Sequence, residues 1–133
     1  ADGGRQLWQA CGGEVGGGAL AGALSLARRR VENGVGCVEV RLGGWDTHRD
    51  NFNQVQALSA QLDAGLGTLI KDLSDRGLLE STLVLCVGEF GRTPQINGDN
   101  GRDHFPDVFS DVIAGAALTA AGSSAGPKIP PPN

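Results

Sequence analysis

Two histidines and the acidic residues beside them are the side chains that could hold a metal ion. The sequence contains only these two histidines, and each has an aspartate within two positions, in Asp46-Thr47-His48 and in Asp103-His104. Residues two apart in an extended stretch point the same way, so Asp46 and His48 would converge. A carboxylate and an imidazole are common ligands of Zn²⁺, Mn²⁺ or Fe²⁺. The pattern predicts a divalent metal site with Asp46, His48, Asp103 and His104 as ligands.

Each of these pairs also has a purely structural interpretation. Asp46 could cap the helix that follows, because aspartate is frequent at helix N-termini, and His48 could hydrogen-bond to its own turn. Asp103-His104 could be a solvent-exposed dipeptide in a polar loop. The joint occurrence of the two pairs favours the metal site, since such groups of ligands are uncommon without a function.

Glu89 and Arg92 form a further polar group, which follows the consecutive apolar residues 83–87. A carboxylate in that position is either desolvated at a cost or paired with a cation. One hypothesis makes Glu89 another metal ligand and Arg92 the group that binds an anionic substrate oxygen, for which its planar guanidinium is suited. The alternative is a structural Glu89–Arg92 salt bridge. No catalytic nucleophile is identified, because Thr47 and Thr93 lack an obvious activating base.

Two helices are expected to position these residues. Helix-forming residues with one apolar face predict a helix over residues 19–32, which ends at Asn33-Gly34. Apolar residues that advance by threes and fours predict a second helix from about residue 51 to residue 76. Gly77 is the expected end of that helix.

Residues 35–42 and 81–87 are predicted to be strands, and the helix between them is long enough to cross over. Such a unit makes the strands parallel and the crossover right-handed. The polar motifs 43–48 and 88–94 would then follow the carboxyl ends of both strands, where open parallel sheets bind ligands. The expected fold class is α/β, a parallel sheet with flanking helices, in which residues 83–87 are covered on both faces.

Length, charge and composition exclude several classes. The chain has 133 residues, a net charge of -4 and one basic cluster, Arg28 to Arg30. These arginines are expected on a solvated helix face, and no nucleic-acid partner is expected, because phosphate binding needs clustered cations. No run reaches the roughly 18 apolar residues of a membrane span, and no signal peptide begins the chain. The odd number of cysteines argues against a full disulfide framework. The sequence indicates no oligomeric state.

Four motifs, taken together and in order, resemble the domain-of-unknown-function family 1501. They are Gly44-Trp45-Asp46-Thr47-His48, Asn51-Phe52, Gly88-Glu89-Phe90-Gly91-Arg92-Thr93-Pro94 and Gly101-Arg102-Asp103-His104-Phe105-Pro106. That family looks like a sulfatase-like branch of the alkaline phosphatase superfamily, and the chain resembles its C-terminal portion. The resemblance implies part of an α/β/α sandwich with a two-metal centre, a divalent ion such as Zn, Mn or Ca, and a phosphate or sulfate ester as the anionic substrate.

The resemblance also implies departures from the superfamily. Glu89-Phe90 stands where phosphatases and sulfatases usually have an Asp-His ligand pair, and Phe90 cannot bind a metal, so one site would be weakened or absent. The superfamily's nucleophile lies in an N-terminal segment that this chain does not contain. The expectation is a fragment of a metal-dependent ester hydrolase, inactive alone, from a family whose members are often exported to the periplasm. A non-catalytic binding or scaffold domain with a structural polar cluster, and a nonfunctional gene fragment, stay open as alternatives.

Composition divides the chain into three parts. Residues 1–18 are predicted to be a flexible Gly-rich segment, and residues 19–115 a partial sulfatase/alkaline-phosphatase-like domain. Residues 116–133 are rich in Ala, Ser and Pro, which predicts a disordered C-terminal tail. This tail departs from the family pattern, and a frameshift in the gene or its assembly is one hypothesis for it. An intact downstream frame without an insertion or deletion, found on resequencing, would contradict that hypothesis.

Overall fold

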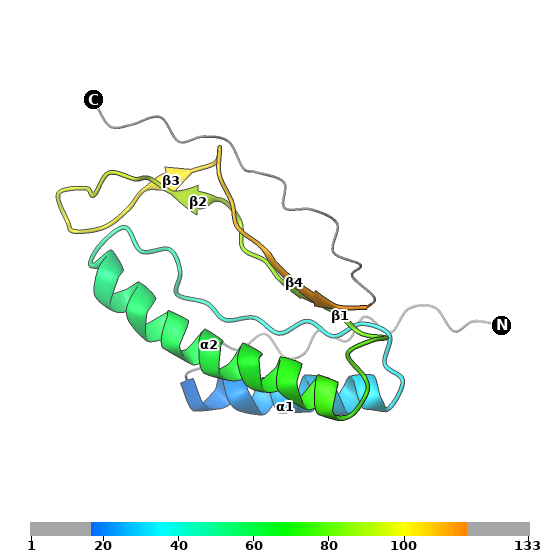
Figure 1. Ribbon diagram of the computed structural model, residues 1–133. Coiled ribbons are helices and arrows are strands. Elements are labelled where there is room, and N and C mark those ends of the chain that lie inside the picture. The colour runs from blue at the N-terminus through cyan, green and yellow to red at the C-terminus, as the bar shows by residue number, and fades with distance from the viewer. Residues whose placement is uncertain (1–16, 117–133) are drawn as a thin grey trace.

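The computed structural model describes residues 17–116, which form two helices and two short antiparallel sheets (Figure 1). The helices are α1 (Gly17–Glu32) and α2 (Asn51–Asp75), and the strands are β1 (Leu83–Cys86), β2 (Gly91–Arg92), β3 (His104–Phe105) and β4 (Val112–Gly115). The helices lie together on one side, and the four strands form a long arm on the other. The chain between the helices, coloured cyan, runs between these two parts.

Both predicted helices are confirmed, and a glycine ends each of them. Gly34 and Gly77 have φ angles of 84° and 68°, in the left-handed region that side chains rarely adopt. In each helix, the N–H groups of this glycine and of the next residue donate to carbonyls three and five residues back, at 2.8–3.0 Å. These bonds satisfy carbonyls that the helix end would otherwise leave without a partner. The first helix begins two residues earlier than predicted, at Gly17.

The two helices pack through a small apolar contact. Leu20, Ala27 and Leu73 are the buried hydrophobic side chains of the described residues. Gly65 of α2 lies at the contact, where an added Cβ would come 2.8 Å from Cδ1 of Leu24. The close approach of the two helices at this point therefore depends on the absence of a side chain at Gly65.

Replacing Gly67 by alanine should stabilise the protein more than replacing Gly65. Nothing lies within 4 Å of a Cβ added at Gly67, so Gly67→Ala should stabilise α2 by roughly 0.5–1 kcal/mol through helix propensity. At Gly65 the end of the Leu24 side chain would have to shift to make room for the added Cβ, so the same gain should be reduced. We expect the Gly67 variant to melt above both the wild type and the Gly65 variant, measured by circular dichroism. A Gly65 variant as stable as the Gly67 variant would contradict the close helix packing.

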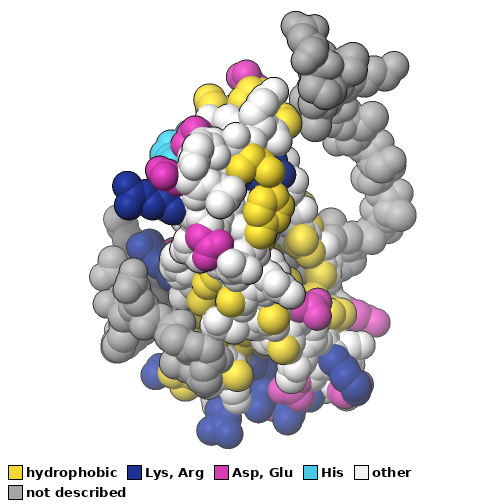
Figure 2. All heavy atoms as spheres, turned by 90° about the vertical axis from the view of Figure 1, so that its left-hand side faces the viewer, with side chains coloured by type: hydrophobic (Ala, Val, Ile, Leu, Met, Phe, Trp, Pro, Cys, Tyr) yellow, Lys and Arg dark blue, Asp and Glu magenta, His cyan; other side chains and the backbone are white. Residues whose placement is uncertain are grey.

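A network of charges also joins the helices. Asp72 of α2 lies 2.8 Å from Nε of Arg28 and 2.7 Å from Nε of Arg76. Arg28 also pairs with Glu32, which lies 3.3 Å from Nη1 of Arg76. Side chains of both signs accordingly gather over the helices, at the bottom of Figure 2. The side chain of Arg28 is only 11% exposed, so its prediction as part of a solvated face is wrong.

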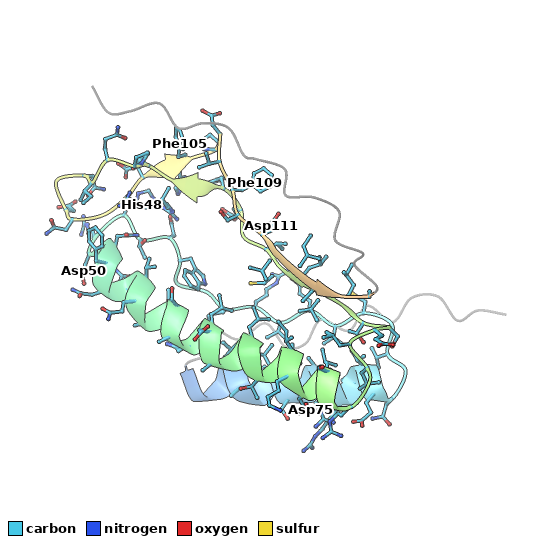
Figure 3. All side chains as sticks on the ribbon, in the orientation of Figure 1. His48, Asp50, Asp75, Phe105, Phe109 and Asp111 are labelled. Atoms are coloured by element: carbon cyan, nitrogen blue, oxygen red, sulfur yellow. The ribbon has the colours of Figure 1, made fainter. Side chains whose placement is uncertain are left out.

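The arm is a long antiparallel hairpin. At its base β1 pairs with β4, with Leu85 opposite Ile113, and near its tip β2 pairs with β3, with Arg92 opposite His104. Phe109 and Asp111 lie on the segment that connects β3 to β4 (Figure 3). The tip of the arm is close to the start of α2, where His48 points toward β2 and β3.

The predicted parallel sheet with flanking helices is wrong. Residues 35–42 belong to no strand, and β1 takes its partner from β4 in an antiparallel ladder. A hydrophobic run shows that a segment can be a strand but does not identify its partner. The chain turns back between β2 and β3, and the pairing of these two strands shortens the loop that must close for β1 to pair with β4. Closing this loop costs less entropy than pairing β1 with residues 35–42, which lie on the other side of α2 in the sequence. The described residues form no α/β/α sandwich either, because both helices lie on the same side of the arm.

The expectation that residues 83–87 are covered on both faces is also wrong. Val84 and Cys86 are half-buried, whereas Leu83, Leu85 and Val87 are each more than half exposed. One face of β1 therefore packs toward the molecule and the other is open.

Several predictions concern residues outside 17–116. The flexible N-terminal segment, the disordered tail and the frameshift fall wholly or mainly on residues 1–16 and 117–133, and the three-part division remains a prediction. Within the described residues, neither helix combines the length and apolarity that crossing a membrane requires.

Candidate metal centre

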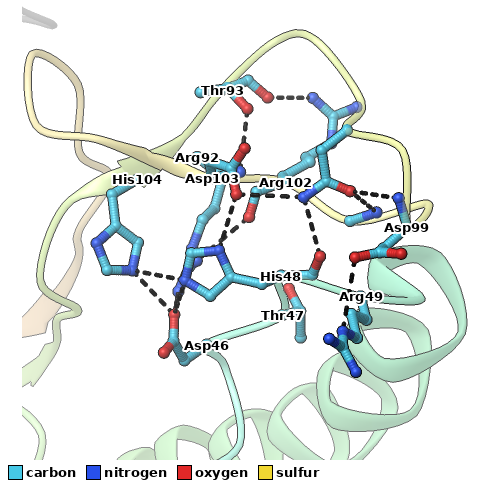
Figure 4. Close-up of polar contacts among 12 residues, drawn as sticks. Asp46, Thr47, His48, Arg49, Arg92, Thr93, Asp99, Arg102, Asp103 and His104 are labelled. Carbon is cyan, nitrogen blue, oxygen red and sulfur yellow. Dashed lines mark hydrogen bonds and ion pairs between the residues drawn. The ribbon is translucent and has the colours of Figure 1, made fainter.

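Three side chains from distant parts of the sequence meet where the tip of the arm lies beside the start of α2 (Figure 4). Oδ1 of Asp46 lies 3.0 Å from Nε2 of His48 and 3.0 Å from Nε2 of His104. The two Nε2 atoms are 3.1 Å apart. We call these three residues the Asp–His–His cluster. It is open to solvent, and Figure 2 shows a histidine at the surface with carboxylates beside it.

The triangle of donor atoms has the size of part of a metal's ligand shell. The donor atoms of the cluster all lie within 4.8 Å of one another. Around an ion with bonds of roughly 2.0–2.1 Å, donors lie ~2.9 Å apart at right angles and ~3.3 Å apart at tetrahedral angles. The observed separations of 3.0 and 3.1 Å fall between these values. The cluster could bind one ion with little rearrangement.

Asp103 fixes the orientation of His48. Nδ1 of His48 donates to Oδ1 of Asp103 at 2.8 Å. In that tautomer the lone pair of His48 is on Nε2, the atom that faces Asp46 and His104. Metal-binding histidines commonly bond a carboxylate in this way, which orients the ring. Asp103 therefore lies behind His48 rather than beside the three donor atoms, and its part as a direct ligand stays a prediction.

Asn97 is a positioning residue that the sequence analysis missed. Its Nδ2 donates to the carbonyl oxygen of His48 at 2.9 Å and to Oδ1 of Asp103 at 3.2 Å. Its Oδ1 accepts from the N–H groups of Asp99 and Gly101 at 3.0 and 2.9 Å. One side chain therefore shapes the loop and ties it to His48 and Asp103. The turn-forming sequence that begins at Asn97 could have pointed to it.

Asn97→Asp should separate these two tasks. The aspartate keeps oxygens that can accept from the loop N–H groups, but it loses the donors to His48 and Asp103. We expect zinc affinity to fall about 10- to 100-fold, as for other groups that orient a metal ligand, and the ring ¹⁵N shifts of His48 to change. Asn53→Asp is the control, because the side chain of Asn53 donates to Asp50 and not to His48 or Asp103. Unchanged zinc affinity and unchanged His48 shifts would contradict the positioning role.

The same loop is docked on the start of α2. The N–H groups of Asp50 and Asn51 donate to two loop carbonyls at 3.0 and 2.9 Å, and the Asp50 side chain makes no cap bond. Gly101 is buried, and a Cβ added there would overlap the backbone of His48. The start of α2, His48 and the loop thus form one packed unit. Loop carbonyls rather than Asp46 cap the helix.

Arg92 holds Asp46 from another side. Its Nη2 donates to Oδ1 of Asp46 at 2.6 Å, and its guanidinium also donates to the carbonyls of Trp45 and Arg102 at 3.3 Å. Hydrogen bonds from His104 and then from Arg92 lower the pKa of Asp46 to about 2. Asp46 is therefore anionic over a wide range of pH. Among residues 17–116, no salt bridge joins Arg92 to Glu89, the structural alternative considered above.

Glu89 is exposed and lies outside the Asp–His–His cluster. The neighbouring ring of Phe90 contacts that of His104, with centroids 4.5 Å apart. Phe90, which the resemblance places at a ligand position, thus packs against one of the three cluster residues. The part of Glu89 as a ligand stays a prediction.

Acid should loosen this region in the metal-free protein. Asp46 has a pKa of about 2, and hydrogen bonds from His48 and then Asn97 lower the pKa of Asp103 from its usual 3.8. Because both pKa values are lowered in the folded state, their stabilising contribution is complete above about pH 4 and is lost as the pH falls through the lowered pKa values, about 2 for Asp46. We expect Asp46→Asn to lessen the fall in melting temperature over this range, measured with a chelator present. Identical acid profiles for wild type and variant would contradict this expectation.

Fold and site together define a small chain of helices and antiparallel strands with two histidines and an aspartate gathered at its surface. The chain matches the family model of a protein of unknown function (DUF1501) over residues 9–127, and it belongs to that family. The family prediction made from the four motifs is confirmed, and the affiliation with sulfatases and alkaline phosphatases stays a prediction. Comparisons with curated proteins and with solved structures found no match.

Proposed function

We propose that Asp46, His48 and His104 bind one divalent metal ion, and that this site belongs to a hydrolase of phosphate or sulfate esters. The observation that carries the proposal is the triangle of Oδ1 and two Nε2 atoms at separations of 3.0 and 3.1 Å. Two imidazoles and one carboxylate suit Zn²⁺, Mn²⁺ or Fe²⁺. Ca²⁺ suits them less, because it takes roughly six to eight oxygen ligands.

The residues of the chain prepare the site for an anionic ester. When bound, the ion supplies a Lewis acid that polarises an ester oxygen. Asp103 holds the His48 ring so that Nε2 faces Asp46 and His104, the residues that would hold the ion with it. Arg92 places a positive charge at the edge of the cluster, where its planar guanidinium is suited to an anionic oxygen. Phosphate and sulfate esters both offer such oxygens.

No nucleophile is proposed within the described residues. Thr47 is buried, and its hydroxyl accepts a hydrogen bond of 2.6 Å from Nδ2 of Asn51. The hydroxyl of Thr93 donates to the carbonyl of Gln95 at 2.8 Å. Both hydroxyls are thus engaged in local structure. We expect this chain to bind the ion and the anion without hydrolysing an ester.

A second candidate is a non-catalytic domain in which the same residues form a structural polar cluster. The Arg92–Asp46 bond of 2.6 Å and the His48–Asp103 bond of 2.8 Å already satisfy both carboxylates without an ion. Charge-assisted bonds of this kind can hold the arm against the start of α2. In that case, adding a chelator leaves the melting temperature unchanged.

Zinc binding by the purified, chelator-treated chain distinguishes the two candidates. The metal site predicts one Zn²⁺ per chain in equilibrium dialysis, and a melting temperature that rises with zinc because the ion binds the folded state. Inorganic phosphate should bind the zinc-loaded chain, and more weakly after Arg92→Gln. The absence of both stoichiometric zinc and a thermal shift would favour the structural cluster. Zinc binding without phosphate binding would keep the metal site and reject the ester substrate.

A further inference from the structure

The open side of the β1–β4 sheet carries four large apolar side chains. Leu83, Leu85 and Val87 alternate along β1 and its continuation, and Ile113 lies directly opposite Leu85. Alternate residues of a strand share one face, and opposite residues of paired strands share it too, so these four make one surface. Each is more than half exposed. We call these four residues the outer arm face.

Exposed apolar residues are concentrated on the arm. Of the ten large hydrophobic residues exposed among the described residues, eight lie between residues 83 and 113. The buried hydrophobic side chains, by contrast, are those of the two helices. Four of these eight residues share the outer arm face, and a contiguous apolar surface, unlike scattered exposed residues, marks a site of interaction.

The charged residues in the chain segments that carry and flank the outer arm face are all acidic. Residues 77–91 and 106–116 include no Lys, Arg or His, and their charged residues are Glu80, Glu89, Asp107 and Asp111. All four are exposed. A second copy of this chain docked face to face would bring like charges together, which is unfavourable. The complementary partner is apolar in the middle and basic at its sides.

The outer arm face has the width of one helix. Two strands about 4.8 Å apart present a strip that a helix roughly 10 Å in diameter can cover. The stretch from Leu83 to Val87 is about 13 Å long, which equals roughly nine residues of helix. We propose that the outer arm face binds an amphipathic helix of another protein, with an apolar stripe flanked by Lys or Arg. This helix would form a third layer, on the side of the arm that faces away from α1 and α2.

Three synthetic peptides test this inference, which does not depend on the metal site. The first is an amphipathic helix with a leucine stripe and a lysine-rich polar face. The second has the same stripe and a glutamate-rich polar face, and the third keeps the lysines but replaces the leucines by serine. In fluorescence anisotropy the first should bind about tenfold or more tightly than the other two, and its affinity should fall as salt is added.

Matched variants locate the binding. Leu85→Ser combined with Ile113→Ser should weaken binding of the first peptide about tenfold, because it removes apolar area from the face. Leu26→Ser should not, although Leu26 of α1 is similarly exposed, at 49% against 56% for Leu85. Circular dichroism checks that the variants are folded. Should the double variant unfold, amide shifts of the wild type on peptide binding give the location, and they should centre on residues 83–87 and 112–115.

Four results would overturn the proposal. They are equal binding of the lysine and glutamate peptides, tight binding of the serine peptide, shifts centred away from the outer arm face, and a wild-type dimer that Leu85→Ser dissociates. The last of these would assign the face to a second copy of this chain.

Discussion

Gly101→Ala should abolish tight zinc binding and lower the melting temperature, whereas Gly98→Ala should do neither. Gly101 is buried, and a Cβ there would overlap the carbonyl group of His48 and lie 2.6 Å from the backbone nitrogen of Arg49. Those are backbone atoms, which cannot rotate away as a side chain does. The loop would have to move off the start of α2, and overpacking of this kind costs about 1–3 kcal/mol or more.

The movement matters because the loop leads directly into Asp103 and His104. His104 would be displaced from His48, and the three donor atoms would no longer lie within reach of one ion. Gly98 is the matched control, because it is exposed in the same loop and nothing lies within 4 Å of a Cβ added there. Zinc titration and thermal unfolding of both variants test this. A Gly101 variant that is less stable but binds zinc like the wild type would show that the loop does not position the cluster.

His104→Ala should abolish stoichiometric zinc binding, and Glu89→Gln should leave it unchanged. His104 provides one of the three converging donor atoms, and Glu89 lies outside the cluster. The same loss is expected for His48→Ala and for Asp46→Ala. Each variant removes a direct ligand, so its effect should exceed the roughly 10- to 100-fold loss expected when a group that only orients a ligand is removed.

Asp103→Asn provides the intermediate step in this series. It retains a polar side chain but weakens the bond that orients the His48 ring, so we expect a loss of about 10- to 100-fold. Zinc affinities measured by competition with a chromogenic chelator should therefore rank the Glu89 variant above the Asp103 variant, and the Asp103 variant above the His104 variant. Strong loss in the Glu89 variant would instead support the wider ligand set expected from the sequence.

The helices could be predicted from the sequence because their signals are local. The spacing of apolar residues gives the helical face, and Asn33-Gly34 and Gly77 give the ends. Strand pairing is different, because the apolar pattern of residues 83–87 fits a partner strand that lies either earlier or later in the sequence. That choice depends on distant residues, and the parallel arrangement inferred with residues 35–42 was wrong.

The members of the cluster could be predicted, although the scaffold that unites them could not. Residue type and spacing pointed to Asp46, His48 and His104, because two histidines each had a nearby aspartate. The sequence reasoning placed them at the edge of a parallel sheet. In the structure the contact is made by a loop that Asn97 shapes and that Gly101 allows to approach the backbone of His48. Tertiary contacts of this kind cannot be predicted from the spacing of apolar residues along the sequence.

X-ray absorption at the zinc edge reads the ligand shell of the loaded chain directly. The chain contains three cysteines as well as two histidines, so both kinds of zinc ligand are available. The spectrum distinguishes them because Zn–S bonds are longer than Zn–N bonds. We predict scattering from two imidazole rings and from oxygen, without sulfur, and loss of one imidazole contribution in His104→Ala. A shell with sulfur, or one without imidazole, would contradict a metal site made by Asp46, His48 and His104.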